Sequence, residues 1–283
     1  MITSRERAAI LVQALPYIKR YSGAIVVVKY GGNAMKSPEL QHQVMEDIVL
    51  LWLVGVKVVL VHGGGPEINQ MMAKIGKEPA FVDGLRVTDE ETMSVVQMVL
   101  AGKVNKDLVN LLQVKGGRAL GIAGTDGHML QAKPKDPRLG LVGTITAVDP
   151  APILDLLSAG YIPVVSTIAA DSEGRSYNVN GDTAAAHIAG ALGAQRLILM
   201  TDIAGVLRDR EDPASLIKEI TVEQARELEA SGVISGGMIP KVECAVNAIE
   251  WGVKNAVIMD GTAAHSIVSE LLTDQGVGTW IHP

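Results

Sequence analysis

The sequence has 283 residues, of which 48% are hydrophobic, and its 25 basic and 31 acidic residues give a net charge of −6. This composition excludes a disordered chain and suffices for two lobes around a large core. The charge balance, without basic runs, argues against nucleic-acid and membrane partners. A single cysteine, Cys244, excludes an intrachain disulfide and a cysteine metal site. The N-terminus carries no signal-peptide pattern, so we expect a cytoplasmic protein.

The chain opens with a predicted helix. Thr3 and Glu6 form a capping box, and apolar residues recur at helical spacing up to Gly23. Pro16 lies inside this pattern and removes a backbone donor, so we expect a kink there. No strand precedes this helix, so it either faces a partner chain or lies on its own domain. We interpret residues 1–23 as an oligomerisation helix.

A buried strand, a glycine turn and a helix follow one another twice. The strands are residues 24–30 and 56–62, and the glycines are residues 31–32 and 63–65. This alternation predicts an α/β fold with a parallel sheet and with ligands at the carboxyl ends of its strands. Consecutive glycines before a helix expose amide N–H groups that bind phosphate or carboxylate. Tight turns without a ligand are the alternative.

The rest of the chain is divided into a middle stretch and a second lobe. A helix capped by Thr88 with Glu91 is expected, then hairpins over 118–150. The pattern restarts at Ser176, so we place the lobe boundary near 170–176, which divides the chain after the first helix into residues 24–175 and 176–283. Before it, a helix at 154–159 leads into a strand at 162–165. The second lobe is predicted to contain helices at 182–192, 238–251 and 265–272, a further helix opened by Thr221 with Gln224, and strands at 196–200, 256–259 and 279–281.

Two lysines lie beside glycine turns. Lys29 is embedded in an apolar strand, and Lys241 opens a helix after a glycine pair. Each alone fits a solvated end residue, but together they fit an electrostatic clamp on a transferring phosphoryl group. The GxxxxGK[ST] and GxGxxG patterns of P-loop and Rossmann proteins do not occur in the sequence.

Further polar residues are candidates for a ligand site. Asn178 and Asn180 lie on the same side of an extended segment that leads to Asp182, which helix capping alone could explain. Arg86 could bind a carboxylate in a bidentate manner, or be an ordinary surface charge. His62, beside the glycine triplet, could be a base, or could pack the strand end or orient the loop.

Six blocks of the sequence resemble the amino-acid kinase family, in order and from end to end. They are VVKYGGNAM (27–35), VLVHGGGPEIN (59–69), FVDGLRVTD (81–89), YNVNGDTAA (177–185), LMTDIAGVL (199–207) and GGMIPKVECA (236–245). The resemblance implies a three-layer αβα sandwich with a mostly parallel central sheet of eight strands. Within the family, the chain is most similar to members that phosphorylate N-acetyl-L-glutamate.

This resemblance implies phosphoryl transfer from MgATP to the γ-carboxylate of N-acetyl-L-glutamate, a step of arginine biosynthesis. Magnesium would be held mainly by ATP oxygens, so no protein metal site is expected. The acceptor carboxylate is already ionised at pH 7, so no general base is required. His62 is then interpreted as packing the strand end or orienting the loop.

The resemblance also assigns roles by position. Lys29 and Lys241 resemble the lysines that stabilise the transition state, and Asp182 resembles the aspartate that organises them. Gly32 and Gly64 match glycines whose N–H groups hold the migrating phosphoryl. The acceptor site would comprise Gly64, Gly65, Arg86, Asn178 and Asn180, with Arg86 on the α-carboxylate. The phosphoryl and ATP side would comprise Gly31, Gly32, Asp202, Ile203, Ala204, Gly205, Val206, Leu207, Ser235, Gly236 and Gly237.

Two features are similar to the arginine-inhibited branch of the family: the helix before the first strand and the C-terminal segment 265–281. In that branch N-terminal helices interlace dimers into a hexamer, and L-arginine binds between that helix and the C-terminal segment. Glu270 and Gly276 are the positions we connect with arginine. A PII-type nitrogen-signalling protein is a further possible partner.

Two alternatives remain open. Sister enzymes phosphorylate aspartate, glutamate, carbamate, UMP or an aminoadipate derivative, and side-chain length of the acceptor cannot be read from sequence. A protein of another class would be a catalytically silent sensor of arginine or nucleotide. The presence of both lysines and of Asp182 argues against the sensor.

Overall fold

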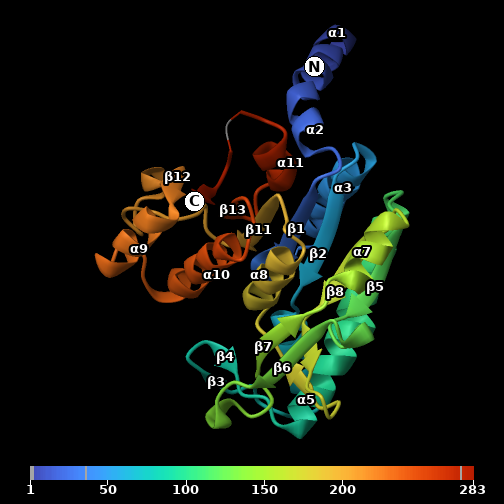
Figure 1. The fold of residues 1–283 in the computed structure, drawn as a ribbon, viewed down its shortest axis with the longest axis vertical. Coiled ribbons are helices and arrows are strands. Elements are labelled where there is room, and N and C mark those ends of the chain that lie inside the picture. The colour runs from blue at the N-terminus through green and yellow to red at the C-terminus, as the bar shows by residue number, and fades with distance from the viewer. Residues whose placement is uncertain (1–2, 36, 275) are drawn as a thin grey trace.

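The computed structural model describes residues 3–35, 37–274 and 276–283. Its centre is an eight-stranded sheet with the strand order β12-β14-β13-β11-β1-β2-β8-β5 (Figure 1). Every neighbouring pair is parallel except β13 and β14. The strands are β1 (Ile25–Tyr30), β2 (Lys57–His62), β5 (Ala119–Ala123), β8 (Ile162–Ser166), β11 (Arg196–Thr201), β12 (Glu219–Thr221), β13 (Ala256–Asp260) and β14 (Thr279–His282).

Helices cover both faces of this sheet, so the expected three-layer α/β sandwich is confirmed. On one face α3 packs against α6 and α11, and on the other α8 packs against α10 and against β1. The inner strands are buried on both faces, which is why they are continuous runs of Val, Ile and Leu. The helices are α1 (Ser4–Gln13), α2 (Leu15–Tyr21), α3 (Pro38–Leu53), α4 (Gly65–Lys74), α5 (Glu90–Gln97), α6 (Asn105–Val114), α7 (Ala151–Ser158), α8 (Gly181–Ala191), α9 (Val222–Ala230), α10 (Ile239–Glu250) and α11 (Ser266–Leu271).

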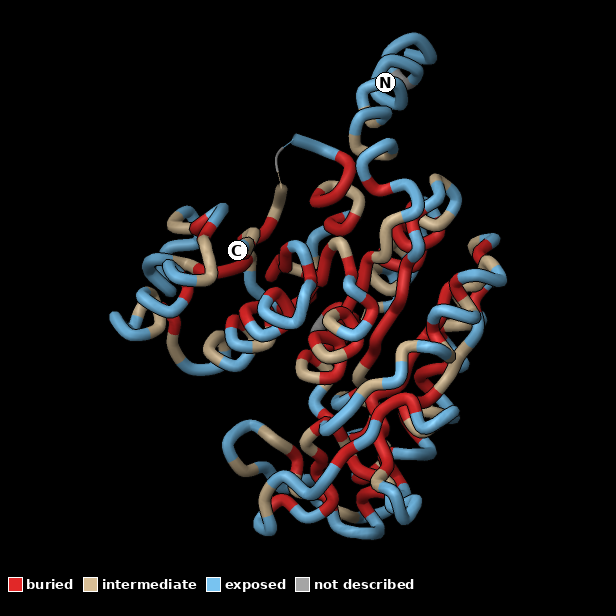
Figure 2. The backbone as a smooth tube through the Cα atoms, viewed as in Figure 1, coloured by how far each residue is buried: buried red, intermediate tan, exposed pale blue. Residues whose placement is uncertain are grey.

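The N-terminal helix is interrupted at one residue, Ala14, two positions before Pro16. The Thr3–Glu6 capping box is present, α1 ends at Gln13 and α2 begins at Leu15, with Pro16 in its first turn. Ala14 keeps α-helical dihedral angles and proline lacks a backbone donor, so the interruption agrees with the kink expected there. α1 projects from the body of the molecule and is exposed around its circumference (Figures 1 and 2). It therefore does not lie on its own domain.

Two smaller sheets lie beside the central one. A four-stranded sheet has the order β10-β9-β6-β7, and β3 pairs with β4 alone. The hairpin expected within 118–150 is confirmed for β6 and β7, but β5 in the same stretch is an edge strand of the central sheet. The strands are β3 (Phe81–Val82), β4 (Leu85–Arg86), β6 (Leu130–Pro134), β7 (Gly143–Val148), β9 (Ile168–Ala170) and β10 (Ser176–Asn178).

The N-cap of α5 differs from the expectation. Asp89, not Thr88, caps this helix by accepting a hydrogen bond from the Thr92 amide. Thr88 is fully buried, where its Oγ1 donates to the Arg86 carbonyl and accepts from Asn178 Nδ2 at 3.2 Å. Thr88 thus connects β4 to β10 rather than starting a helix.

A π-helical segment (Met98–Val104) joins α5 to α6. Short 3₁₀ turns occupy Gly32–Met35, Asp126–His128, Pro137–Leu139, Pro213–Ser215 and Gly236–Met238. Among the described helices, none combines the length and the apolar character needed to cross a membrane.

Candidate active site

Lys29, Asp182 and Lys241 meet at the carboxyl end of β1, although they come from three different elements. Lys29 lies near the end of β1, Asp182 in the first turn of α8 and Lys241 near the start of α10. Lys29 Nζ is 2.9 Å from Asp182 Oδ1, and Lys241 Nζ donates to Asp182 Oδ2 at 2.7 Å. The structure thus brings together the three residues expected to act on the phosphoryl group.

The Asp182 carboxylate is available to both lysines because another residue caps α8. Asn180 Oδ1 accepts hydrogen bonds from the amides of Asp182 and Thr183 at 2.9 and 3.1 Å. Helix capping therefore does not explain Asp182. Burial raises the pKa of its carboxyl, but the two ammonium groups outweigh that effect and hold the pKa below its usual value. The group is an anion between two cations.

Glycines surround the Lys29 side chain. A Cβ on Gly31 would lie 3.0 Å from Lys29 Nζ, and one on Gly181 would lie 3.2 Å from Lys29 Cε. Either addition would be a tight contact to which the lysine side chain must yield by a few tenths of an ångström. Gly32 has a φ of +70°, which an L-residue rarely adopts, and it begins the 3₁₀ turn after β1.

A cavity of about 200 Å³ lies on the side of the glycine triplet. Every residue predicted for the acceptor lines it, together with the loop that leads to Asp182. Its walls include Gly63, Gly64, Gly65, Phe81, Arg86, Leu100, Thr167, Asn178, Asn180 and Gly181. We refer to it as the acceptor cavity.

Arg86 is not a surface charge, because it is only 8% exposed. Its Nη2 donates to Asn69 Oδ1 at 2.6 Å and to the Gly65 carbonyl at 3.3 Å. Its guanidinium also lies 4.9 Å from the centre of the Phe81 ring. Asn69 was not singled out from the sequence; its position one helical turn after Gly65 on α4 was the available signal.

A second cavity of about 610 Å³ lies beyond β11 and reaches Lys241. It is lined by Thr201, Asp202, Ile203, Gly205, Val206, Leu207, Arg210, Glu211, Val233, Ile234, Ser235, Gly237, Met238 and Lys241. Of the residues expected on the phosphoryl and ATP side, Gly31, Gly32, Ala204 and Gly236 do not line it. Arg210 and Glu211 do line it, although no motif in the sequence indicates them. We refer to it as the nucleotide cavity.

The three charged residues therefore lie between two cavities. Lys241 belongs to the wall of the nucleotide cavity, while Gly181, beside Lys29, belongs to the wall of the acceptor cavity. Among the described residues, no group of three or more His, Cys, Asp or Glu side chains could hold a metal ion. Both oxygens of Asp182 form ion pairs with lysines.

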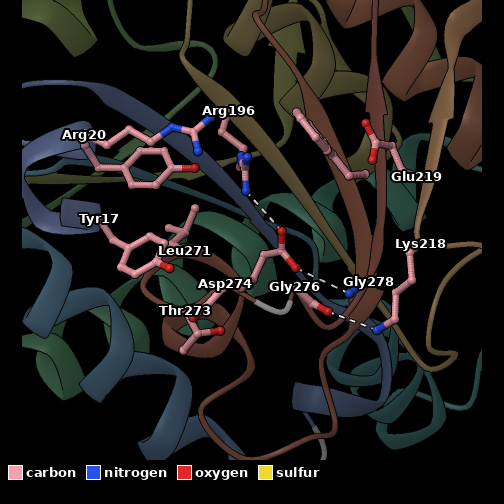
Figure 3. A pocket seen from close by; sticks show the side chains of 13 residues that line it. Tyr17, Arg20, Arg196, Lys218, Glu219, Leu271, Thr273, Asp274, Gly276 and Gly278 are labelled. Atoms are coloured by element: carbon pink, nitrogen blue, oxygen red, sulfur yellow. Dashed lines mark hydrogen bonds and ion pairs between the residues drawn. The ribbon is translucent and has the colours of Figure 1, made fainter. Parts of the chain in front are cut away.

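A third cavity, of about 300 Å³, lies between α2, α11 and the start of β11 (Figure 3). It contains Glu270 and Gly276, the two positions connected with arginine from the sequence. Glu270 Oε1 forms an ion pair with Arg196 Nη1 at 3.0 Å, and its Oε2 accepts from the Val277 amide at 2.8 Å. Lys218 Nζ donates to the Gly276 carbonyl at 3.0 Å. The other walls include Tyr17, Arg20, Tyr21, Glu219, Asp274 and Trp280.

Comparison with known proteins decides the family. The model described as the amino acid kinase family matches residues 24–260. The chain belongs to this family. It is 51% identical to the acetylglutamate kinase of Synechococcus elongatus over 98% of this chain and 92% of that protein. It is 52% identical to the acetylglutamate kinase of Clostridioides difficile over 98% of this chain and 97% of that protein.

Solved structures of this family share the fold. The N-acetylglutamate synthase of Neisseria gonorrhoeae, complexed with coenzyme A and N-acetyl-glutamate, superimposes with a TM-score of 0.84 at 27% identity. The match covers 98% of this chain but 63% of the synthase, so the chain spans less than two thirds of that protein. The same synthase complexed with coenzyme A and L-arginine has a TM-score of 0.81 at 25% identity, covering 97% and 65%.

Proposed function

We propose that this chain transfers the γ-phosphoryl group of ATP to the γ-carboxylate of N-acetyl-L-glutamate, giving N-acetyl-L-glutamyl 5-phosphate and ADP in arginine biosynthesis. The observation that carries the proposal is the pair of lysines held on one aspartate between two cavities. The acetylglutamate kinases that match at about half identity over nearly their full length support the same substrate.

In this proposal the protein accelerates the transfer by stabilising charge on the phosphoryl group and by positioning the two substrates. The acceptor carboxylate is an anion at pH 7 and attacks without a general base. Lys29 and Lys241 stabilise the charge that spreads over the transferring group, and Asp182 fixes the distance between them. The N–H groups of Gly32 and Gly64 donate to the phosphoryl oxygens. Magnesium enters with ATP, whose phosphates would hold it.

The two cavities receive different substrates. In the acceptor cavity Arg86 binds the α-carboxylate, because its guanidinium is buried and already oriented by Asn69. Asn178 donates to Thr88, which leaves its carbonyl oxygen for the acetamido N–H. ATP occupies the nucleotide cavity with its γ-phosphate toward Lys241. Residues 24–175 and 176–283 then form the acceptor lobe and the ATP lobe.

The third cavity suits L-arginine as an inhibitor. Glu270 offers a carboxylate to a guanidinium, and Arg20 and Lys218 offer cations to a carboxylate. Tyr17 and Trp280 add aromatic rings on which a guanidinium can stack. The synthase solved with L-arginine supports this ligand for a related fold.

We place the protein in the cytoplasm, as a dimer that α1 joins into a hexamer, with a PII-type protein as a possible partner.

The deciding experiment is hydroxylamine trapping of the acyl phosphate. The full chain is incubated with MgATP and, in parallel, with N-acetylglutamate, glutamate, aspartate, N-acetylaminoadipate and carbamate. We expect hydroxamate from N-acetylglutamate at a rate well above the others. Hydroxamate from another carboxylate alone would reassign the acceptor. No product from any acceptor, with arginine and nucleotide still binding, would favour a catalytically silent sensor.

A further inference from the structure

His62 is a fully buried histidine next to the glycine triplet. It is the last residue of β2, where it pairs with Tyr30 of β1 and Ser166 of β8. Its Nδ1 lies 2.8 Å from the Gly63 carbonyl oxygen, and its Nε2 lies 3.1 Å from Asn105 Nδ2. The ring therefore bridges the backbone of the triplet and the first residue of α6.

The neighbours of Asn105 fix which nitrogen of His62 carries the proton. Asn105 Nδ2 donates to the Val164 carbonyl at 2.9 Å, and its Oδ1 accepts from Lys106 Nζ at 3.0 Å, so the amide cannot be turned over. The amide thus donates to His62 Nε2. Because the Gly63 oxygen can only accept, Nδ1 carries the hydrogen and donates to it. Burial lowers the pKa of the imidazole to about 4, which agrees with this neutral form.

The hydrogen bond to Gly63 fixes the next peptide plane. The peptide bonds of the described residues are trans, so the carbonyl of Gly63 and the N–H of Gly64 point in opposite directions. The carbonyl faces His62 in the core, and the N–H faces away from it. On the other side, the Gly63 amide donates to the Tyr30 carbonyl at 3.2 Å. Hydrogen bonds therefore fix both the amide and the carbonyl of Gly63.

The Gly64 N–H has no acceptor of its own. Gly64 is buried and lines the acceptor cavity, and within the described part of the chain its amide donates to no protein group. A buried amide left without an acceptor is costly, which indicates that a ligand atom completes it.

We propose that His62 is a positioning residue: its Nδ1–H holds the Gly63 carbonyl so that the Gly64 N–H is directed at the transferring phosphoryl group. The inference rests on the proposed phosphoryl transfer and assigns His62 no contact with substrate. Asn105 acts one step further away, because it fixes the tautomer. A preoriented donor of this kind stabilises charge that develops during transfer without having to reorganise.

The test compares two substitutions at one position. His62→Asn keeps an N–H donor at the place of Nδ1, whereas His62→Phe keeps a ring and removes the donor. We expect kcat of the Phe variant to fall about 10- to 100-fold, because a misdirected donor loses part of its effect, and the Asn variant to recover most of that loss. The affinity for ADP–aluminium fluoride with N-acetylglutamate should fall in parallel with kcat, while ATP affinity changes by less than about twofold.

Controls separate positioning from folding and from base catalysis. His187→Phe changes the half-buried histidine that stacks on Trp251 and should leave kcat unchanged. The kcat of the unmodified chain should not vary with the titration of a histidine between pH 6 and 8. If His62→Phe turns over as the unmodified chain does, or if Asn rescues nothing, the proposal is wrong. If His62→Phe does not fold, the same comparison is made between His62→Asn and His62→Gln, because glutamine lacks the donor at the δ position. Absence of hydroxamate from the unmodified chain would instead contradict the proposed function.

Discussion

At the scale of single residues, the proposed role of Lys29, Asp182 and Lys241 is to stabilise the transferring group, while the residues of the two cavities bind the substrates. Lys241 reaches Asp182 from a helix start, and its side chain keeps 21% of its accessibility, so its removal disturbs the core little. Lys29 is more deeply placed, between Gly31 and Gly181. Lys241 is therefore the better residue with which to measure the contribution of one cation.

We expect Lys241→Ala to lower kcat by about 10²- to 10³-fold, the usual effect of removing one preorganised stabilising group. The melting temperature should change little. Steady-state hydroxamate formation and thermal unfolding measure the two effects, and Lys254→Ala, an exposed lysine, is the matched control. Turnover close to normal would mean that Lys241 does not contact the transferring group.

The residues that the sequence could not reveal act through other residues. Arg86, Asp182 and the two lysines are conspicuous because a charge in an apolar or glycine-rich setting calls for a partner. Asn69 and Asn105 are ordinary helix residues in a sequence, and their roles arise from contacts to Arg86 and His62. Thr88 was assigned to a helix cap because capping patterns are local, whereas its actual partner, Asn178, lies 90 residues away.

At the scale of elements, α11 depends on α3. Asp47 of α3 is 1% exposed, and its carboxylate accepts from His265 Nδ1 at 2.7 Å and from the Val268 amide at 3.2 Å. These bonds hold the first turn of the helix that carries Glu270. The start of α11 is thus attached to α3 through one buried carboxylate.

We expect Asp47→Ala to destabilise the protein by about 1–3 kcal/mol, since it leaves a buried amide without its acceptor. Arginine inhibition should weaken while kcat stays near normal, because α11 does not touch the acceptor or nucleotide cavity. Chemical denaturation and inhibition curves measure these changes. Glu46→Ala removes the neighbouring exposed carboxylate and serves as control. If Asp47→Ala leaves arginine inhibition unaffected, the assignment of the third cavity to arginine is wrong.

Elements were predicted well where burial alone determines them. The strands at 24–30, 56–62, 196–200 and 256–259 agree with the observed ones to within a residue, because both faces are covered and polar residues occur only near the strand ends. β5 was missed because it is a half-exposed edge strand interrupted by Gly121. That glycine is required by packing, since a Cβ there would lie 1.9 Å from Asn105 Oδ1.

At the scale of the molecule, the end of α1 and the start of α2 expose four neighbouring apolar side chains that no other described residue of the chain covers. Leu11 is 72% exposed and Val12 62%, with Ile10 and Leu15 beside them. Such a patch is typical of an interface with another chain. α2, which continues from it, supplies Tyr17 and Arg20 to the third cavity, so in the proposed function assembly and inhibitor binding would depend on one segment.

We expect a chain without residues 1–20 to keep its turnover and to lose both arginine inhibition and the larger assembly. The acceptor and nucleotide cavities contain no residue of that segment, whereas the third cavity loses two of its lining residues, Tyr17 and Arg20. Light scattering after size exclusion measures assembly, and turnover with and without arginine measures inhibition. Inhibition that survives the truncation would refute the assignment of α2 to the arginine site.

The order of the neighbouring strands β2, β1 and β11 sets the distance between the two proposed substrate sites. The glycine triplet follows β2, Lys29 lies one residue before the end of β1, and the nucleotide segment follows β11, so in the proposed function the two substrates would approach from strands on either side of β1. Two strand spacings amount to about 10 Å, and sheet hydrogen bonds allow no adjustment of that figure. A longer or shorter acceptor must therefore be accommodated at its far end, by the β3–β4 hairpin, which pairs only with itself and carries Arg86. In the proposed function, a change of acceptor would then require a remodelled β3–β4 hairpin and no change at Lys29, Asp182 and Lys241.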